Sequence, residues 1–477
     1  MNLQSEKIRV LQNRKNFQMG FLICEILILT GVLASLTHGK GVDWDEAFTY
    51  KLVTQNNLAG IIQATASDVH PPLYYLIAKL FVAVFGSKLN VFTWVSIIPT
   101  VFGMLLVSVY IRKRWGTLTA AILIWCLALG PYLLFYSCEI RMYSWMNFFV
   151  LGALLMTREV VEEKKKCYWL FLFLFSVAAV YTQYFSFLPL FFFYVYIFLQ
   201  FLRSRSKRKL LALAVLCTAD MVSYLPWIGI FCKQLQISGN PVKGYEFRFS
   251  PVVFFEETFH TGLEAEAILM MVLFLSAIIF LILFRKKFTG MEFSFLRMLF
   301  LNFIFCFFVS QWLGSLNGHF FSFRYIIYCV TFVWIVSSAI YIRISPPVRM
   351  SFIIWSVILG ISGYSSVYAS EYGMNQKMSY TEQFIRQNVA SDAELVYNMS
   401  TFDTLFEYYM PGHRFIYFDD LKLDEMKGKT FWFIQLGGRD FTDAAKQAYH
   451  LQIEDYKGFG YTGMKQFELE RVTVPVS

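Results

Sequence analysis

The sequence predicts a mainly α-helical membrane protein of about 11 transmembrane helices, with interfacial helices in its first outer loop and a small α/β domain at its C-terminal end. The chain is 57% hydrophobic and only 16% charged, whereas soluble proteins carry roughly 25% charged residues. Apolar stretches of about 17–25 residues recur, each long enough to cross a bilayer. Short basic clusters separate them, which is the pattern that orients membrane proteins.

The net charge of +9 does not indicate a nucleic-acid partner, because Lys and Arg gather at the ends of the apolar stretches. The eight cysteines lie mostly inside apolar stretches and are expected to be buried thiols rather than a disulfide framework. The first apolar run is long and lacks a small-residue cleavage site, so it is expected to stay as an anchor. The predicted surroundings are therefore the lipid bilayer of the cell membrane.

Basic residues set the predicted orientation. Lys7 and Arg14 precede the first apolar run and place the N-terminus in the cytoplasm, and the cluster Arg112–Arg114 is also predicted to be cytoplasmic. An even number of crossings must separate the two clusters, yet three apolar segments lie between them. The middle segment is short, carries Lys79 and follows two prolines. It is therefore predicted to be an interfacial helix within one long outer loop, about residues 37–94.

The same alternation continues along the chain and leaves the C-terminus outside the cytoplasm. After residue 370 the composition becomes that of a soluble protein, in which β-rich runs alternate with helical patterns. The β-rich runs are 394–398, 414–418, 431–435 and 467–472, and the helical patterns are 380–388, 402–409 and 442–449. The predicted domains are a transmembrane domain over 1–370 and an extracytoplasmic α/β domain over 371–477.

Two adjacent carboxylates, Asp45 and Glu46, follow the first apolar stretch inside the predicted outer loop, flanked by Trp44 and Phe48. A carboxyl beside an apolar wall loses hydration, which raises its pKa and makes it a better base towards a hydroxyl. The alternative is an ordinary solvated acidic pair at the end of a span. Position alone favours that alternative.

Several motifs, taken in order, resemble a known family. An Asp-Glu pair after the first span, followed by His70 and two prolines, resembles the GT-C glycosyltransferases, and within them the branch of protein O-mannosyltransferases and aminoarabinose (lipid A) transferases. The runs SCEIRMYSW at 137–145, YLPW at 224–227 and HFFSFRYII at 319–327 are similar to further motifs of that branch and follow in the same order. The likeness covers roughly residues 1–370.

The resemblance implies transfer of a sugar from a polyprenyl-phosphate-linked donor to an acceptor hydroxyl outside the cytoplasm, with inversion at the anomeric carbon. Asp45 would be the general base that takes the acceptor proton, and Glu46 would orient it or hold a nearby cation. The acceptor would be a cell-envelope glycan, a lipid or a protein.

On the other face of the sugar, the leaving phosphate needs positive charge. Arg324 and Arg141 are the candidates, because a guanidinium presents a fork of donors matched to phosphate oxygens. The alternative for Arg324 is that a long cation extends to the membrane interface. The alternative for Arg141 is a pair with Glu139.

The remaining substrate-binding candidates come from the same motifs: His70, Glu139, Tyr143, Gln183 and Tyr325. Two prolines hold His70 in place, where it would contact the phosphate or the acceptor, or ligate a metal; a structural histidine is an equal alternative. Tyr143 stands where aminoarabinose transferases have a further acid, and Gln183 where many relatives have histidine. The missing histidine weakens the case for a transition metal, and the sequence leaves the binding of a divalent cation open.

Two other functions are weighed against transfer. A transporter or flippase of lipid-linked glycans is expected to show internal repeats and broken helices near the membrane midplane. The sequence has no clear repeat, and its polar motifs cluster at the outer ends of predicted spans. A non-catalytic membrane module that recruits partners through its outer domain is the third reading, and the presence of the ordered motifs argues against it.

Overall fold

The structure is a computed structural model of the 477-residue chain. It describes residues 3–162, 165–237, 251–259, 264–316, 321–390, 393–399, 403–435, 440–461 and 466–476. Contacts divide the chain into two compact units. The first comprises Met1–Ser35 and Asn56–Val367, and the second comprises Leu36–Gln55 and Tyr368–Ser477. The segment Leu36–Gln55 thus packs with the C-terminal residues, whereas the sequence analysis assigned it to the transmembrane domain.

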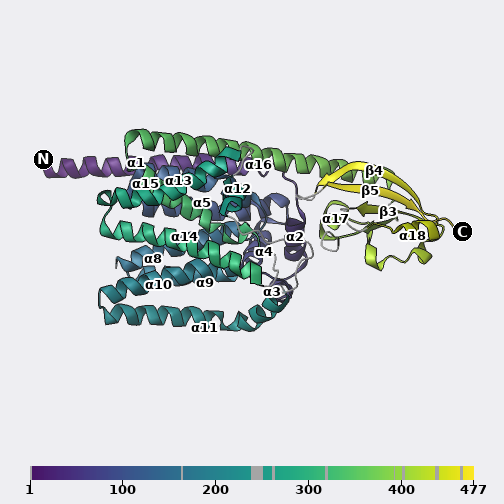
Figure 1. Cartoon of the computed structure of the whole chain (residues 1–477), viewed down its shortest axis with the longest axis horizontal. Helices are drawn as coiled ribbons and strands as arrows, with labels where there is room; N and C mark the ends of the chain where they lie inside the picture. Colours follow the sequence, from purple (N-terminus) through teal and green to yellow (C-terminus); the bar gives the residue numbers. More distant parts are fainter. Residues whose placement is uncertain are drawn as a thin grey trace. The chain divides into compact units, whose positions relative to one another are not determined.

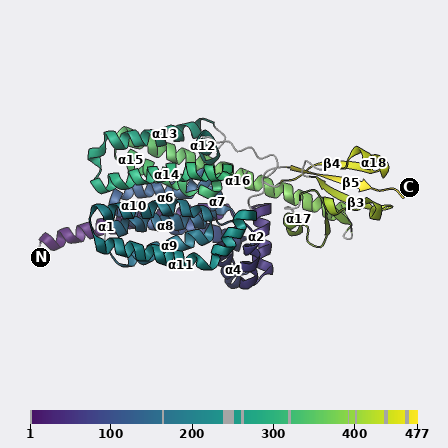
Figure 2. The ribbon, with the colours of Figure 1, turned by 60° about the horizontal axis from the view of Figure 1, so that its bottom comes forward.

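The regular elements of the first unit are all helices within its described residues, and its long helices run side by side in both views (Figures 1 and 2). Its elements are α1 (Leu3–Ser35), α3 (Leu58–Ala66), α4 (Leu73–Phe85), α5 (Leu89–Trp115), α6 (Thr117–Leu129), α7 (Pro131–Cys138), α8 (Tyr143–Val161), α9 (Cys167–Thr182), η1 (Tyr184–Ser186), α10 (Phe187–Arg203), α11 (Lys207–Ile237), α12 (Pro251–Phe259), α13 (Glu264–Leu283), η2 (Arg285–Lys287), α14 (Gly290–Leu316), η3 (Phe323–Ile326), α15 (Tyr328–Tyr341) and the first part of α16 (Pro346–Asn388).

Within the described residues, seven helices are long and apolar enough to cross a membrane, and the bent pair α6–α7 would make an eighth. The outer faces of these helices carry exposed large apolar side chains, which lipid solvates and water does not. Examples are Leu27, Ile28, Leu211, Met221 and Ile282. The predicted class, a mainly α-helical multi-pass membrane protein, is confirmed. The total of about 11 spans stays a prediction.

The bend between α6 and α7 measures 56° and has a local cause. Pro131 occupies the first turn of α7, where its missing N–H costs nothing. Gly130 precedes it, and a Cβ at that residue would lie 2.5 Å from the Cys126 carbonyl oxygen and 3.0 Å from the Trp334 indole nitrogen. Only glycine therefore lets the chain turn here against α15.

Helix α4 corresponds to the helix that was predicted to lie at the membrane interface. It follows Pro72 and ends at Gly86, whose φ of 85° lies in the left-handed region that glycine adopts readily. Its 13 residues extend about 20 Å at 1.5 Å per residue, short of a hydrocarbon core of about 30 Å. Length therefore supports a helix that does not cross, and its place at the interface stays a prediction.

The second unit contains the predicted small α/β domain, which is confirmed as a fold. Its strands are β1 (Glu394–Tyr397), β2 (Arg414–Tyr417), β3 (Thr430–Gln435), β4 (Gln452–Tyr461) and β5 (Gln466–Thr473), in the order β2-β1-β3-β5-β4. The first three are parallel, and β5 pairs antiparallel with both β3 and β4. Its helices are α2 (Trp44–Gln55), α17 (Asp403–Tyr409), α18 (Asp443–Ala448), the short turns η5 (Phe418–Asp420) and η6 (Leu423–Met426), and the last part of α16.

Strand β3 is buried on both faces, as expected of a central strand. Phe431 and Phe433 belong to one core with Val396 and Val472. On the opposite face, the Trp432 ring meets Phe384 of α16 edge to face, with centroids 5.8 Å apart. The four consecutive apolar residues of β3, 431–434, are thus explained by packing on both faces of the sheet.

Glu470 is a buried carboxyl in this otherwise apolar region. It lies on β5 opposite Phe433 and Asp455 and is 7% exposed. Burial raises the pKa of Glu470 to about 7, and Asp440 and Asp455 add to the rise. The folded chain therefore holds this proton over a pH range in which the unfolded chain has lost it.

We expect Glu470→Gln to remove a pH dependence from the second unit. Because the folded state binds the extra proton, stability should fall as pH rises from about 4.5 to about 7. Hydrogen exchange of β3 and β5 amides in the full-length protein, corrected for the intrinsic rate at each pH, measures this. Protection should fall over the window in the wild type and fall less in the variant, in which Asp43 and Glu371 still titrate; identical pH dependence in both would contradict the assignment.

Candidate active site

The predicted acidic pair lies in the first turn of α2, and a reciprocal capping box fixes the start of that helix. The Glu46 N–H donates to Asp43 Oδ1 at 2.8 Å, and the Asp43 N–H donates to Glu46 Oε2 at 3.1 Å. Each side chain thus satisfies a backbone donor that the helix end leaves unpaired. Carboxylates are also stabilised at this positive end of the helix dipole.

The second Glu46 oxygen pairs with a buried lysine. Lys40 Nζ lies 2.9 Å from Glu46 Oε1 and 3.0 Å from Glu371 Oε2 of α16. Lys40 and Glu46 are 6% and 1% exposed. Burial alone would lower the pKa of Lys40, but Glu371 and Glu46 raise it well above its ordinary value. Both Glu46 oxygens therefore make structural contacts, and its predicted role of orienting Asp45 stays a prediction.

Asp45 lies between the two capping residues and is also buried, at 6% exposed. Its carbonyl oxygen accepts from the Thr49 hydroxyl at 3.1 Å, so the α2 backbone at this residue is already helical. Burial, and then the charges of Glu46 and Asp45, raise the pKa of neighbouring Asp43 above its usual range, and Lys40 opposes the rise. The carboxyls at the start of α2 thus interact electrostatically with one another.

Other contacts hold the chain around α2. The Val42 N–H donates to the Tyr409 hydroxyl oxygen at 2.7 Å, and that hydroxyl lies 3.2 Å from the Val42 carbonyl oxygen. The rings of Tyr50 and Tyr408 meet edge to face at 5.1 Å. A Cβ at Gly41 would lie 2.7 Å from the Met374 side chain. Helix α2 is therefore fixed to α17 and to the end of α16 within the second unit.

A second cluster of predicted residues lies in the first unit, around the short helix η3. The Arg324 guanidinium carbon lies 5.5 Å from the ring centroid of Tyr143 and 5.7 Å from that of Tyr325. The Tyr325 ring is 6.3 Å from the rings of both His70 and Tyr143. Residues that are far apart in the sequence therefore meet here, and their role in binding stays a prediction.

Arg141 and Glu139 lie in the connection between α7 and α8, two and four residues before Tyr143. Both are buried, at 3% and 4% exposed. The Arg141 guanidinium donates to the Tyr75 hydroxyl of α4 at 3.3 Å, and the Arg141 N–H donates to the Glu139 carbonyl oxygen at 2.8 Å. The connection is therefore held against α4. It leads directly into Tyr143, whose ring lies beside Arg324.

Gln183 is placed by a break between α9 and η1. It is buried, its backbone is extended, and its carbonyl oxygen accepts from the Ser186 N–H at 3.1 Å. Two residues on, the Phe185 ring stacks on Tyr325 with centroids 5.5 Å apart, and the Phe185 carbonyl oxygen accepts from the Tyr328 hydroxyl at 2.9 Å. The Gln183 turn therefore packs against η3, the turn that carries Arg324.

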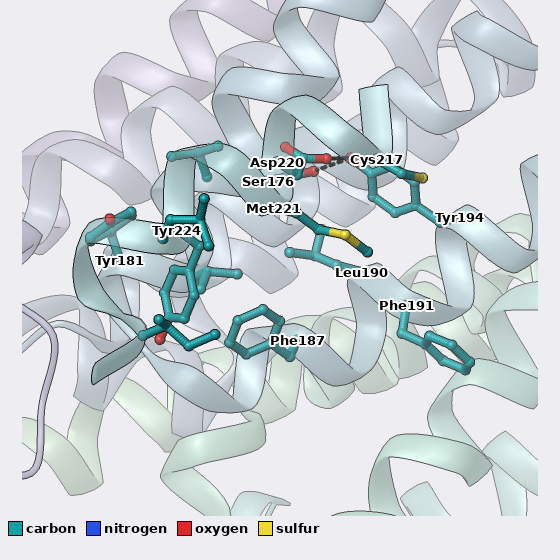
Figure 3. Close-up of a pocket in the computed structure, with 14 residues that line it drawn as sticks. Ser176, Tyr181, Phe187, Leu190, Phe191, Tyr194, Cys217, Asp220, Met221 and Tyr224 are labelled. Carbon is teal, nitrogen blue, oxygen red and sulfur yellow. Dashed lines mark hydrogen bonds between the residues drawn. The ribbon is translucent and has the colours of Figure 1, made fainter. Parts of the chain in front are cut away.

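A separate cavity of about 490 Å³ lies among α9, α10 and α11 (Figure 3). At one end the Tyr194 hydroxyl donates to Asp220 Oδ2 at 2.6 Å and lies 3.1 Å from the Ser176 hydroxyl. The rest of its lining is almost wholly apolar, and it includes none of the predicted site residues and no Lys or Arg. This cavity cannot supply the positive charge that a phosphate needs.

Sequence reasoning missed Lys40 and Asp43. The capping box could have been found, because Asp43 and Glu46 have the spacing of that motif. Lys40 gave no local signal, since its partner Glu371 is remote in sequence. Among the described residues, no group of three or more His, Cys, Asp or Glu side chains is arranged to hold a metal ion.

Residues 69–227 match the family described as dolichyl-phosphate-mannose-protein mannosyltransferase, whereas no curated protein sequence matches the chain. The structure is similar to ArnT from Cupriavidus metallidurans bound to undecaprenyl phosphate, with a TM-score of 0.62, 12% identity, and coverage of 95% of this chain and 98% of that one. The apo form of the same protein gives a TM-score of 0.60 at 11% identity, with the same coverage.

The oligosaccharyltransferase AglB from Archaeoglobus fulgidus, in complex with an inhibitory peptide and a dolichol-phosphate, is also similar. It gives a TM-score of 0.50 at 11% identity over 87% of this chain and 69% of that one. At such identities the likeness to solved structures establishes the fold. The chain therefore has the fold of the GT-C superfamily of integral-membrane glycosyltransferases, as the sequence motifs predicted, and its residues 69–227 resemble the protein mannosyltransferase branch.

Proposed function

We propose that the protein is a glycosyltransferase that moves a sugar from a polyprenyl-phosphate-linked donor to an acceptor hydroxyl, with inversion, on the extracytoplasmic side of the membrane. The family match over residues 69–227 and the GT-C fold support this reaction class. Solved proteins of the same fold hold undecaprenyl phosphate or a dolichol-phosphate. The basic clusters support a cytoplasmic N-terminus and an extracytoplasmic C-terminal domain.

One observation carries the proposal: Arg324 lies against the rings of Tyr143 and Tyr325, and the Tyr325 ring is 6.3 Å from that of His70. Rings on a guanidinium restrict its orientation while leaving its charge in place. Such an arginine is suited to a phosphate, because negative charge builds on the phosphate oxygens as the sugar leaves. Arg141, Glu139 and Gln183 are proposed to line the same binding region.

In the proposed reaction, the acceptor oxygen attacks the anomeric carbon while the bond from that carbon to the phosphate oxygen breaks. Asp45 accepts the proton from the acceptor hydroxyl, and the electron pair of the broken bond stays on the polyprenyl phosphate. Arg324 stabilises that anion. Glu46 keeps Asp45 in place through the capping box and its ion pair with Lys40.

We expect Asp45→Asn to lower transfer by about 10²–10⁴-fold, because the amide cannot take the acceptor proton. Purified protein is incubated with radiolabelled polyprenyl-phosphate hexoses and a membrane extract, and label in the acceptor is counted. Glu407→Gln is the control, since Glu407 is an exposed partner of Lys51 and should leave transfer unchanged. Equal labelling by Asp45→Asn and wild type would overturn the base assignment. Movement of a lipid-linked glycan across vesicles without transfer would favour the transporter instead.

We expect Arg324→Gln to weaken binding of undecaprenyl phosphate by about 10–100-fold, the worth of a charge-assisted hydrogen bond. Arg324→Lys should fall between, because it keeps the charge and loses the fork. Calorimetry in nanodiscs measures the affinity. Arg285→Gln removes another arginine that lies over an aromatic ring, that of Phe293, and should bind as the wild type does. Unchanged affinity in Arg324→Gln would contradict the phosphate role.

A further inference from the structure

We propose that Lys40 is a positioning residue for Asp45, and that the balance of charge between Lys40 and Glu371 sets the pH range in which Asp45 works as a base. The inference rests on the proposed function, because it requires Asp45 to take the acceptor proton. It assigns a role to two residues outside the family motifs. It also explains why a lysine is buried next to the start of α2.

The positional part of the role follows from a chain of contacts. Lys40 Nζ holds Glu46 Oε1 at 2.9 Å, and the other Glu46 oxygen accepts the Asp43 N–H at 3.1 Å. Asp43 in turn accepts the Glu46 N–H at 2.8 Å. These bonds fix the backbone on both sides of Asp45, so its carboxylate leaves the first turn of α2 in a defined direction.

The same ammonium group of Lys40 also connects this turn to α16. Its ammonium lies 3.0 Å from Glu371 Oε2 on α16. A buried ammonium with two carboxylate partners is held by both, and losing one partner leaves charge uncompensated. Lys40 therefore places the first turn of α2 relative to α16 within the second unit.

The electrostatic part follows from counting the charges that face this turn. Asp43, Asp45 and Glu46 lie on the turn or next to it, and Glu371 faces it from α16. Lys40 pairs with Glu46 and Glu371 and acts electrostatically on Asp43. From α17, the hydroxyls of Tyr408 and Tyr409 lie within electrostatic range of Glu46. The further charges are Glu382 of α16, which acts on Tyr408, and the exposed pair of Lys51 and Glu407. Among these named groups of the described residues, carboxyl groups outnumber ammonium groups.

The excess of carboxyl groups affects the pKa of the neighbouring Asp43. Burial, Glu46 and Asp45 raise the pKa of Asp43, and the charge of Lys40 works against them. Asp45 belongs to the same turn, so the same charge is expected to act on it as well. Removing Lys40 should make the ionised form of Asp45 harder to reach, and removing Glu371 should make it easier.

Two variants separate this role from simple structural support. Lys40→Met removes the ion pairs with both Glu46 and Glu371, and Glu371→Gln removes only the second, so a purely structural tie would weaken in both variants and more in Lys40→Met. The charge balance changes in opposite directions. We expect the acid limb of kcat/KM against pH to move up by about one pH unit in Lys40→Met and down by a similar amount in Glu371→Gln.

Two controls complete the experiment, which uses the transfer assay on the full-length protein. Lys40→Arg keeps the charge and should keep the acid limb in place. Lys51→Met removes a lysine of α2 whose partner Glu407 is exposed, and should also leave the limb unmoved. If Lys40→Met fails to fold, the comparison of Glu371→Gln with wild type still decides, because its limb must move down.

A shift of the limb in the same direction in both variants, or in neither, would overturn the inference while the proposed function stands. Loss of the proposed function has a different signature. In that case the wild type itself transfers no label, whereas failure of the base assignment alone shows as transfer at the wild-type rate by Asp45→Asn, with the acid limb retained.

Discussion

The second unit depends on one buried ion cluster, in which Lys40 lies between Glu46 and Glu371. A lysine can be buried only if carboxylates replace its water, and breaking such a pair costs about 3–5 kcal/mol. The cluster joins Leu36–Gln55 to residues more than three hundred positions later. It explains why a segment next to the first span packs with the C-terminal domain, and why the first turn of α2 is held so firmly.

Both groups of candidate residues lie where a helix begins or is interrupted. Asp45 is in the first turn of α2, Arg324 is in the short helix η3, and Gln183 separates α9 from η1. At such places backbone groups lack helical partners, and apolar surroundings require that side chains or turns supply them. Burying a polar side chain therefore costs less free energy at a helix end, where it can pair with a backbone group. The candidate catalytic and binding side chains of this protein lie at such places.

Much of the fold could be predicted, because hydrophobic run length and charge placement report directly on spans. The β-rich runs also correspond to β1, β2, β3 and β5. Strand β4 was missed, since it contains Gly458 and Gly460 and several charged residues, which disfavour strands. The motifs pointed to His70, Tyr143, Arg324 and Tyr325, which do meet. The partnership of Lys40 with Glu371 could not be found, because tertiary packing alone brings these residues together.

The capping box has a consequence for any cation that approaches the acidic pair. One oxygen of Glu46 holds the backbone N–H of Asp43 and the other holds Lys40. A metal ion that took Glu46 as a ligand would have to compete with both, and the first turn of α2 would loosen as the ion bound. Metal occupancy and helix order at this position are therefore in competition, so that a cation compatible with an intact α2 must find its ligands elsewhere.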